Sequence, residues 1–317
     1  MKKGYLYIIL STFIFSTMEI AGKIANNGLN PFQLNFLRFL IGGLILILPT
    51  IKVIKEKNIK LTKKDLGYFT ITGLLGVVVS MSLFQLAIVY TKSSTVAVLF
   101  STNPIFTIPF AYFILKENLN KSTIAAIVIS LIGIGCILNP FGIKMNRADL
   151  IGIILAILAA ITFSLYSVLV KMKSEKFGSI VINCLSFLFG DFIMLILMLL
   201  SRLPIFNIRV GTKLNSMIYN IPIFKGISSS NILILLYLGI VVTGLGYLLY
   251  FLAMDQTSVV MASLVFFVKP ALAPILALLI LQESIPLNTI FGILFILLGS
   301  FVMLKHKKQK SKALELS

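Results

Sequence analysis

The sequence predicts an all-α integral membrane protein with ten transmembrane helices, built as two inverted five-helix repeats. Three observations support this prediction. Hydrophobic residues make up 58% of the 317 residues and charged residues only 12%, whereas soluble domains have about 45–50% and about 25%. Ten apolar stretches follow one another, each of about 20 residues and therefore able to cross about 30 Å of hydrocarbon. The first five stretches also resemble the last five in sequence.

The apolar stretches are expected to be helices because they do not alternate apolar with polar residues, as the strands of a membrane barrel would. The first stretch follows Lys2 and Lys3, as in a signal peptide, but no small-residue cleavage site ends it, so we expect it to remain as a helix. The predicted spans are 4–24, 31–51, 66–90, 93–115, 121–139, 149–171, 178–201, 231–253, 257–281 and 288–304.

The distribution of basic residues predicts the orientation. Lysines gather in segments 52–64, 116–121 and 171–176 and in the C-terminal tail, which all lie on one side of the predicted topology. Because cytoplasmic connections carry the excess of Lys and Arg, both termini are expected in the cytoplasm, with the chain multi-pass in the cell membrane. The net charge of +18 is then explained by contact with anionic lipid, and no nucleic-acid partner is expected.

An internal repeat organises the chain. Segment 86–119 aligns without a gap with segment 252–285, and we call this alignment, which places Leu86 on Leu252, the repeat register. Nearer the start of each half, Phe15-Ser16 meets Phe163-Ser164. A unit of five helices crosses the membrane an odd number of times, so its second copy would enter the membrane from the opposite side. Inverted repeats are typical of secondary transporters, with the substrate site near the midplane. A duplicated structural scaffold is the alternative.

Each half is similar to an EamA unit of the drug/metabolite transporter superfamily. The resemblance is carried by "FLRFLIGGLIL", by the prolines of "TNPIFTIP" and "VKPALAP", by "LKENL" and "LQESI", and by a glycine-containing final helix in each half. It divides the chain into a first repeat at 1–140, a second at 149–305 and a basic cytoplasmic tail at 306–317. It implies a ten-helix exporter of small metabolites that has no ATPase.

Four charged residues lie inside predicted spans: Glu19, Arg38, Asp191 and Lys269. Isolated charges in a membrane are costly, so pairing is expected. Glu19 and Arg38 have similar depths in the first hairpin, which predicts a structural ion pair, with a protonatable Glu19 on a gated pathway as the alternative. Asp191 and Lys269 lie near the midplane. Lys269 would either pair with Asp191 or contact an anionic group of the substrate.

Lys269 and Asn103 occupy equivalent positions in the repeat, and each precedes a proline, Pro270 or Pro104. A proline removes one hydrogen bond within the helix and disturbs the preceding turn, which is tolerated only against protein or a water-filled cavity. We therefore expect Lys269 and Asn103 to face each other as a binding floor. Packing and hinge roles are equally open for the two prolines.

Other polar residues on the inner helices are candidates for a cavity lining: Gln85, Tyr166, Tyr247 and Tyr250. Tyr247 and Tyr250 are three residues apart and share a helix face. Ordinary hydrogen bonding between helices is the alternative for each. Glu117 and Glu283 end equivalent helices, and we expect them to cap the following helix or to pair with lysines in the connections.

Together these features predict a secondary transporter of small metabolites, amino acids or related carboxylates above all, working by alternating access. The alternative is a receptor or scaffold that binds a small molecule without transporting it. The sequence has no G-x-x-x-x-G-K-[ST] motif, nucleophile elbow or metal-ligand spacing, so neither an enzyme nor a cofactor is expected. The expected partners are a small-molecule substrate, the lipid bilayer and protons, and a homodimer is left open.

Overall fold

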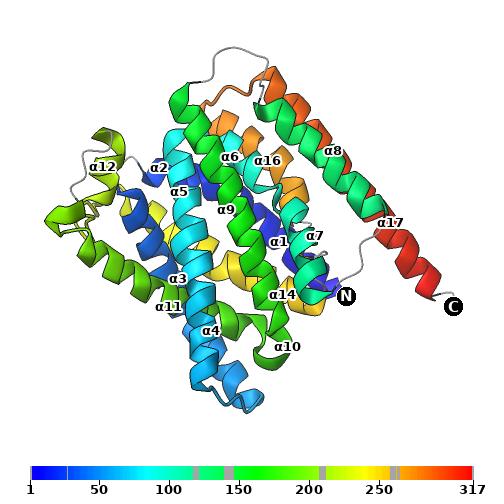
Figure 1. The fold of residues 1–317 in the computed structure, drawn as a ribbon, viewed down its shortest axis with the longest axis horizontal. Helices are drawn as coiled ribbons and strands as arrows, with labels where there is room; N and C mark the ends of the chain where they lie inside the picture. The colour runs from blue at the N-terminus through cyan, green and yellow to red at the C-terminus, as the bar shows by residue number, and fades with distance from the viewer. Residues whose placement is uncertain are drawn as a thin grey trace.

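A computed structural model describes residues 2–26, 28–116, 121–138, 146–206, 212–257, 262 and 265–315. These residues form helices and no strand, which confirms the all-α prediction (Figure 1). Among them, seven helical segments are long and apolar enough to cross a membrane: Lys3–Ala25, Pro31–Glu56, Lys63–Tyr90, Ser93–Leu115, Arg147–Met172, Ser179–Leu200 and Ile232–Gln256. The other three predicted spans contain shorter apolar helices, Ile127–Ile137, Leu272–Leu281 and Leu287–Gly299. The count of ten spans stays a prediction.

The residues at the start of α3 are ones that favour a helix N-terminus. Asn30, which precedes Pro31, forms a capping box with Gln33. Its Oδ1 accepts hydrogen bonds from the backbone N–H groups of Phe32 and Gln33, and the Oε1 of Gln33 accepts one from the backbone N–H of Asn30. The elements of this half are α1 (Lys2–Ser16), α2 (Met18–Ala25), α3 (Pro31–Glu56), α4 (Lys63–Gly73), the π-helix η1 (Leu74–Ser80), α5 (Met81–Tyr90), α6 (Ser93–Phe100), α7 (Asn103–Leu115) and α8 (Lys121–Leu138).

The fourth predicted span is broken next to its proline. Helix α6 ends at Phe100, and α7 begins at Asn103, immediately before Pro104. The proline ring has no N–H to continue the helix. In the repeat register this break corresponds to residues 267 and 268, but α16 runs through them without interruption from Val265 to Leu281, with Pro270 inside the helix. The break is therefore found in the first half and is not repeated ahead of Pro270.

The second half repeats the order of the first. Its elements are α9 (Arg147–Met172), α10 (Ser174–Phe177), α11 (Ser179–Leu200), η2 (Pro204–Phe206), α12 (Thr212–Ile218), α13 (Ile232–Leu236), the π-helix η3 (Tyr237–Gly246), α14 (Tyr247–Gln256), α16 (Val265–Leu281) and α17 (Leu287–Glu315). The final helix therefore extends into the predicted tail.

Local conformation recurs in the repeat register. Helix α5 begins at Met81 and α14 begins at the equivalent residue, Tyr247, and each directly follows a π-helix. Lys116 ends α7 in the left-handed region at φ 55°, and its equivalent, Gln282, follows α16 at φ 53°. At these positions the two halves share local helix structure as well as their sequence pattern.

The halves interlock instead of standing apart. Helix α5 packs on α9, as its equivalent α14 packs on α1, and α7 packs on α9 as α16 packs on α1. Equivalent helices also pair directly, α3 with α11 and α8 with α17. Figure 1 shows α8 and α17 running side by side along one margin of the bundle. Much of the packing between helices is therefore packing of one half against the other.

Glycine lets α4 and α11 approach each other closely where they cross. A Cβ atom on Gly73, at the end of α4, would lie 2.4 Å from the backbone oxygen of Ser186 and 2.7 Å from the backbone nitrogen of Gly190 in α11. Small residues let the backbones of membrane helices approach this closely. The crossing joins the first half to the second.

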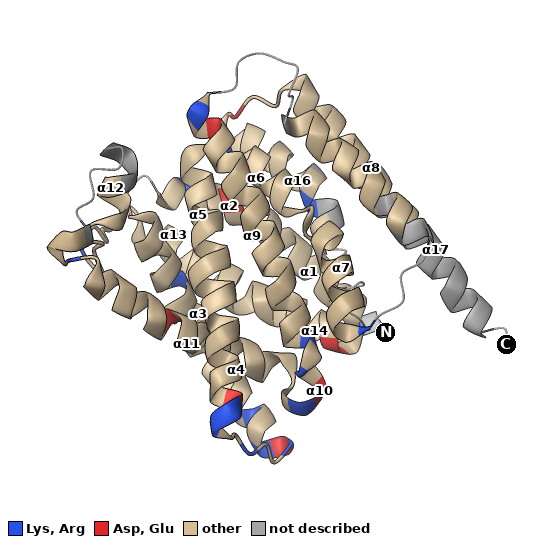
Figure 2. Cartoon of the chain, viewed as in Figure 1, with Lys and Arg blue, Asp and Glu red and all other residues tan. Residues whose placement is uncertain are grey.

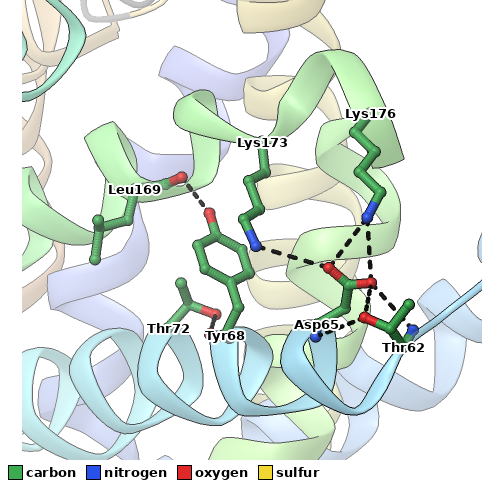
Figure 3. A network of polar contacts seen from close by, with 7 residues as sticks. All are labelled: Thr62, Asp65, Tyr68, Thr72, Leu169, Lys173 and Lys176. Atoms are coloured by element: carbon green, nitrogen blue, oxygen red, sulfur yellow. Dashed lines mark hydrogen bonds and ion pairs between the residues drawn. The ribbon is translucent and has the colours of Figure 1, made fainter.

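A polar network joins the halves at the end of the bundle where basic residues gather (Figures 2 and 3). Asp65 caps α4 together with Thr62 and pairs with Lys176 at 3.2 Å and Lys173 at 3.7 Å. The ammonium group of Lys173 also lies 4.3 Å from the ring centroid of Tyr68, whose hydroxyl donates to a backbone oxygen of α9. We call this end the lysine-rich end. Its placement in the cytoplasm stays a prediction.

Candidate functional site

Four charged side chains are buried in the middle part of the bundle. Glu19 lies on α2, Arg38 on α3, Asp191 on α11 and Lys269 on α16, and none is more than 2% exposed. Each half contributes one acid and one base, so their formal charges sum to zero. Buried charges in a membrane protein face the protein interior, pair with one another and mark functional sites. We refer to these four residues as the charged centre.

The direct ion pair of the charged centre joins Glu19 to Lys269. Oε1 of Glu19 lies 2.5 Å from Nζ of Lys269, and both side chains are 0% exposed. The predicted pair of Glu19 with Arg38 and the alternative pair of Asp191 with Lys269 were therefore wrong as direct pairs. Counting residues gave each charge its depth, but the partner depends on helix packing, and α2 packs against α16.

Aromatic rings surround the two buried cations, Arg38 and Lys269, in positions where water would otherwise solvate them. The Arg38 guanidinium carbon lies 4.8 Å from the ring centroid of Phe39 and 5.9 Å from that of Phe84. The Lys269 ammonium lies 5.9 Å from Phe84 and 5.2 Å from Phe100. Ring faces attract cations, most strongly where water is excluded. Sequence reasoning missed these phenylalanines as contacts of the two cations.

Asp191 and Arg38 keep hydrogen-bonding capacity that no described residue uses. Both carboxylate oxygens of Asp191 are buried without a hydrogen-bond partner, and so are Nε and Nη2 of Arg38. Arg38 is near enough to Asp191 and to Glu19 to interact with both electrostatically. Buried polar atoms are nearly always hydrogen-bonded, and leaving them unpaired costs stability. These atoms are therefore suited to bind a polar ligand.

Tyr247 is close enough to Arg38 and Glu19 to interact electrostatically with both, and Tyr250 packs on the same Phe15 ring as Tyr247. The Tyr247 ring packs near three phenylalanines, at centroid distances of 5.2 Å, 5.3 Å and 5.8 Å from Phe15, Phe187 and Phe39. The Tyr250 ring packs 5.8 Å from Phe266. An aromatic wall next to paired charges is typical of sites for small amphipathic molecules.

Asn103 already uses its amide within the protein. Its Nδ2 donates to the backbone oxygen of Ala160 at 3.2 Å, and its Oδ1 accepts from the Thr107 hydroxyl at 2.9 Å. The amide therefore ties α7 to α9, and the binding floor that Asn103 would form with Lys269 stays a prediction.

Tyr166 and Gln85 are also engaged. The hydroxyl of Tyr166 donates to the side-chain oxygen of Asn183. Gln85 Nε2 donates to Asn26 Oδ1 at 2.9 Å, whereas its own Oε1 has no hydrogen-bond partner among the described residues. Gln85 Oε1 is therefore a polar atom that a ligand could use.

Glu283 joins the two halves at the end opposite the lysine-rich one. Its Oε1 accepts from the backbone N–H and the hydroxyl of Ser93, both at 2.9 Å, and its Oε2 accepts from the N–H of Ser94 at 3.0 Å and the hydroxyl at 2.8 Å. Glu283 was expected to cap the next helix, α17, but it caps α6 of the other half. Lys92 donates to the backbone oxygen and hydroxyl of Ser284 beside it. Glu117 lies outside the described residues.

The Glu283 contact predicts a defined pH dependence. Burial alone would raise the pKa of Glu283, but the hydrogen bonds from Ser94 and Ser93 outweigh it and lower the pKa below its usual value. Because the folded-state pKa is depressed, the stabilisation is fully present above the unfolded pKa of about 4.3 and is lost as pH falls through the folded value. We expect the melting temperature of wild type to exceed that of Glu283→Gln at pH 7, and the difference to vanish in acid. A pH-independent difference would contradict this account.

The chain is similar to one described family and to proteins named as transporters. A model of the EamA-like transporter family matches residues 2–139 and again residues 150–305. An uncharacterized transporter of Clostridium kluyveri is 47% identical over 315 residues, covering 98% of this chain and 95% of that protein. The uncharacterized transporter YoaV of Bacillus subtilis is 25% identical and covers 95% and 97%. A solved crystal structure, 17% identical, covers 97% of this chain and 98% of its own with a TM-score of 0.66, a likeness of fold alone.

Proposed function

Because the chain belongs to the EamA-like transporter family, we propose that it is a secondary exporter of small zwitterionic metabolites, amino acids above all. The observation that carries this proposal is the pair of unsatisfied groups on Asp191 and Arg38. A ligand ammonium group would bind the Asp191 carboxylate, and a ligand carboxylate would bind the Arg38 guanidinium. Charge-assisted hydrogen bonds of this kind are the strong ones.

The charge balance favours a zwitterion over an anion or a cation. The charged centre is formally neutral, and Glu19 and Lys269 already neutralise each other at 2.5 Å. A ligand with no net charge keeps the buried site neutral, whereas a net charge near the middle of a membrane would be costly. The rings of Phe39, Tyr247 and Phe187 offer an apolar surface to the ligand's side chain.

The proposed mechanism is alternating access between two inverted repeats. It is supported by the internal sequence repeat, by the recurrence of π-helices and helix ends in the same register, and by the location of the charged centre on helices from both halves. The helix break before Pro104 is a natural hinge, and Pro270 is its proposed counterpart. Glu19 and Asp191 are the proposed sites of proton coupling, with both termini in the cytoplasm.

The test is substrate counterflow in proteoliposomes with a panel of labelled amino acids, their amides and their deaminated acids. We expect uptake of at least one amino acid and of neither truncated analogue, because each analogue leaves Arg38 or Asp191 unpaired. Asp191→Asn is expected to reduce counterflow about 100-fold, since truncating a buried charge pair costs about 2–5 kcal/mol. An imposed pH gradient should stimulate wild type and not the variant.

The matched control is Asp149→Asn, at the start of α9, which can still accept the hydrogen bond from the Thr91 hydroxyl. It should transport like wild type. Amino-acid binding without counterflow would favour the receptor or scaffold instead. Equal counterflow by wild type and Asp191→Asn would show that Asp191 does not bind the substrate.

A further inference from the structure

The contact between Glu283 and α6 joins the two halves at one end of the bundle. Glu283 belongs to the connection after α16, in the second half, and α6 belongs to the first half. Gln282, directly after α16, adopts the left-handed conformation at φ 53°. Figure 1 shows this connection and the start of α6 at the same end of the bundle, opposite the α3–α4 connection. One carboxylate accepts all four hydrogen bonds described above.

Helix α6 depends on this contact for its N-terminal cap. Its own N-cap residue, Lys92, makes no side-chain capping bond, so Glu283 satisfies N–H groups that the helix itself leaves open. The carboxylate also lies at the positive end of the helix dipole, where a negative charge is favoured. Separating the two halves at this end would therefore uncap α6 and leave a partly buried carboxylate without donors.

The sequence does not repeat this arrangement at the lysine-rich end. In the repeat register, Glu117 is the equivalent of Glu283, but valines 259 and 260 are the equivalents of Ser93 and Ser94. Valine has no hydroxyl to donate. The two hydroxyl donors of the contact thus exist in one copy of the repeat only, although the acid is present in both.

We propose that Glu283, Ser93 and Ser94 form a latch that holds the bundle closed at the end away from the lysine-rich loops and must be released whenever the halves part there. The latch goes beyond the proposed function, because it concerns which end of the protein opens and names no substrate. Val96, three residues after Ser93 on α6, is 0% exposed in this state. Residues spaced by three share a helix face, so Val96 lies beneath the latch.

The test measures how fast a water-soluble maleimide labels a cysteine placed under the latch. The reporter is Val96→Cys in a chain whose own cysteines are replaced (Cys136→Ser, Cys184→Ser). Opening of the latch by Glu283→Gln is expected to increase the labelling rate about tenfold or more, because hydrogen bonds to a charged group shift a two-state equilibrium by that order. Ser93→Ala with Ser94→Ala, which keeps both backbone donors, should give a smaller increase. Glu56→Gln, in an exposed ion pair with Lys52, is the matched control and should change nothing.

A second reporter separates opening at one end from general loosening. Cys184, buried near the start of α11 at the lysine-rich end, is retained as the single cysteine in a Cys136→Ser chain. The latch predicts that Glu283→Gln leaves its labelling unchanged or slows it. Equal acceleration at both reporters, or none at Val96→Cys, would overturn the proposal. If Glu283→Gln does not fold, the double variant Ser93→Ala with Ser94→Ala tests the proposal by the same two labelling rates, at Val96→Cys and at Cys184. Because labelling needs no substrate, failure here is distinct from failure of the transport proposal.

Discussion

Replacing Lys269 with methionine is expected to lower the free energy of unfolding by about 3–5 kcal/mol and to abolish transport. The substitution leaves the Glu19 carboxylate fully buried with its ion-pair partner removed, since Lys269 is the residue that pairs with it at 2.5 Å. Nearby Arg38 offers only partial compensation, because it also interacts with Asp191. Thermal unfolding of the purified protein in detergent measures the loss. The matched control is Lys52→Met, at a side chain 77% exposed, which should not change the melting temperature.

The double variant Glu19→Gln with Lys269→Met separates a structural role of the pair from a functional one. Replacing both members of a buried ion pair by neutral residues is often neutral or stabilising, so we expect stability to return. If the double variant is stable and inactive, the pair carries part of the transport cycle. If it is stable and active, the pair only holds α2 to α16. Lys269→Met as stable as Lys52→Met would contradict the buried pair itself.

The second large effect is expected at Gly73. A methyl group in Gly73→Ala would meet the backbone oxygen of Ser186 at 2.4 Å and the backbone nitrogen of Gly190 at 2.7 Å. Backbone atoms cannot rotate away as a side chain can, so α4 and α11 must separate along their crossing. Overpacking of this kind costs about 1–3 kcal/mol, and the better helix propensity of alanine recovers only part of it.

Gly67 and Gly135 supply the control for that experiment. A Cβ atom at either position would meet nothing within 4 Å. Alanine there should be neutral or slightly stabilising, because only helix propensity changes. Melting temperatures of the three variants, compared side by side, isolate the crossing from the general effect of replacing a glycine in a helix. Equal stability of Gly73→Ala and Gly67→Ala would mean that the helices do not cross so closely.

The limits of most helices could be predicted from the sequence because they depend on local features. The predicted spans 31–51, 93–115 and 178–201 correspond to helices that begin at Pro31, Ser93 and Ser179. Apolar length and the residues that start or stop a helix fix these limits. The partners in the charged centre could not be predicted in this way. Depth follows from counting along one helix, but pairing depends on how each helix is rotated and which helix lies beside it.

Glu283 illustrates the same limit at the end of a helix. Its role as a cap follows from its residue type, and that part of the prediction is confirmed by its bonds to Ser93 and Ser94. The helix that it caps was predicted wrongly, because the next helix along the chain is the natural candidate in a sequence. Packing of α16 on α6 brings a helix start from the other half within reach. The consecutive serines at 93 and 94 were the available signal.

The paired π-helices carry information about the history of the chain. A π-helical bond encloses one residue more than an α-helical bond, and removing that residue would turn everything after it by about 100°. Segments η1 and η3 overlap in the repeat register and are followed by α5 and α14, which begin at equivalent residues. An extra residue inserted separately into two finished halves would have needed two matching rotations. A widened turn already present in one ancestral unit before duplication accounts for the shared position without two separate insertions.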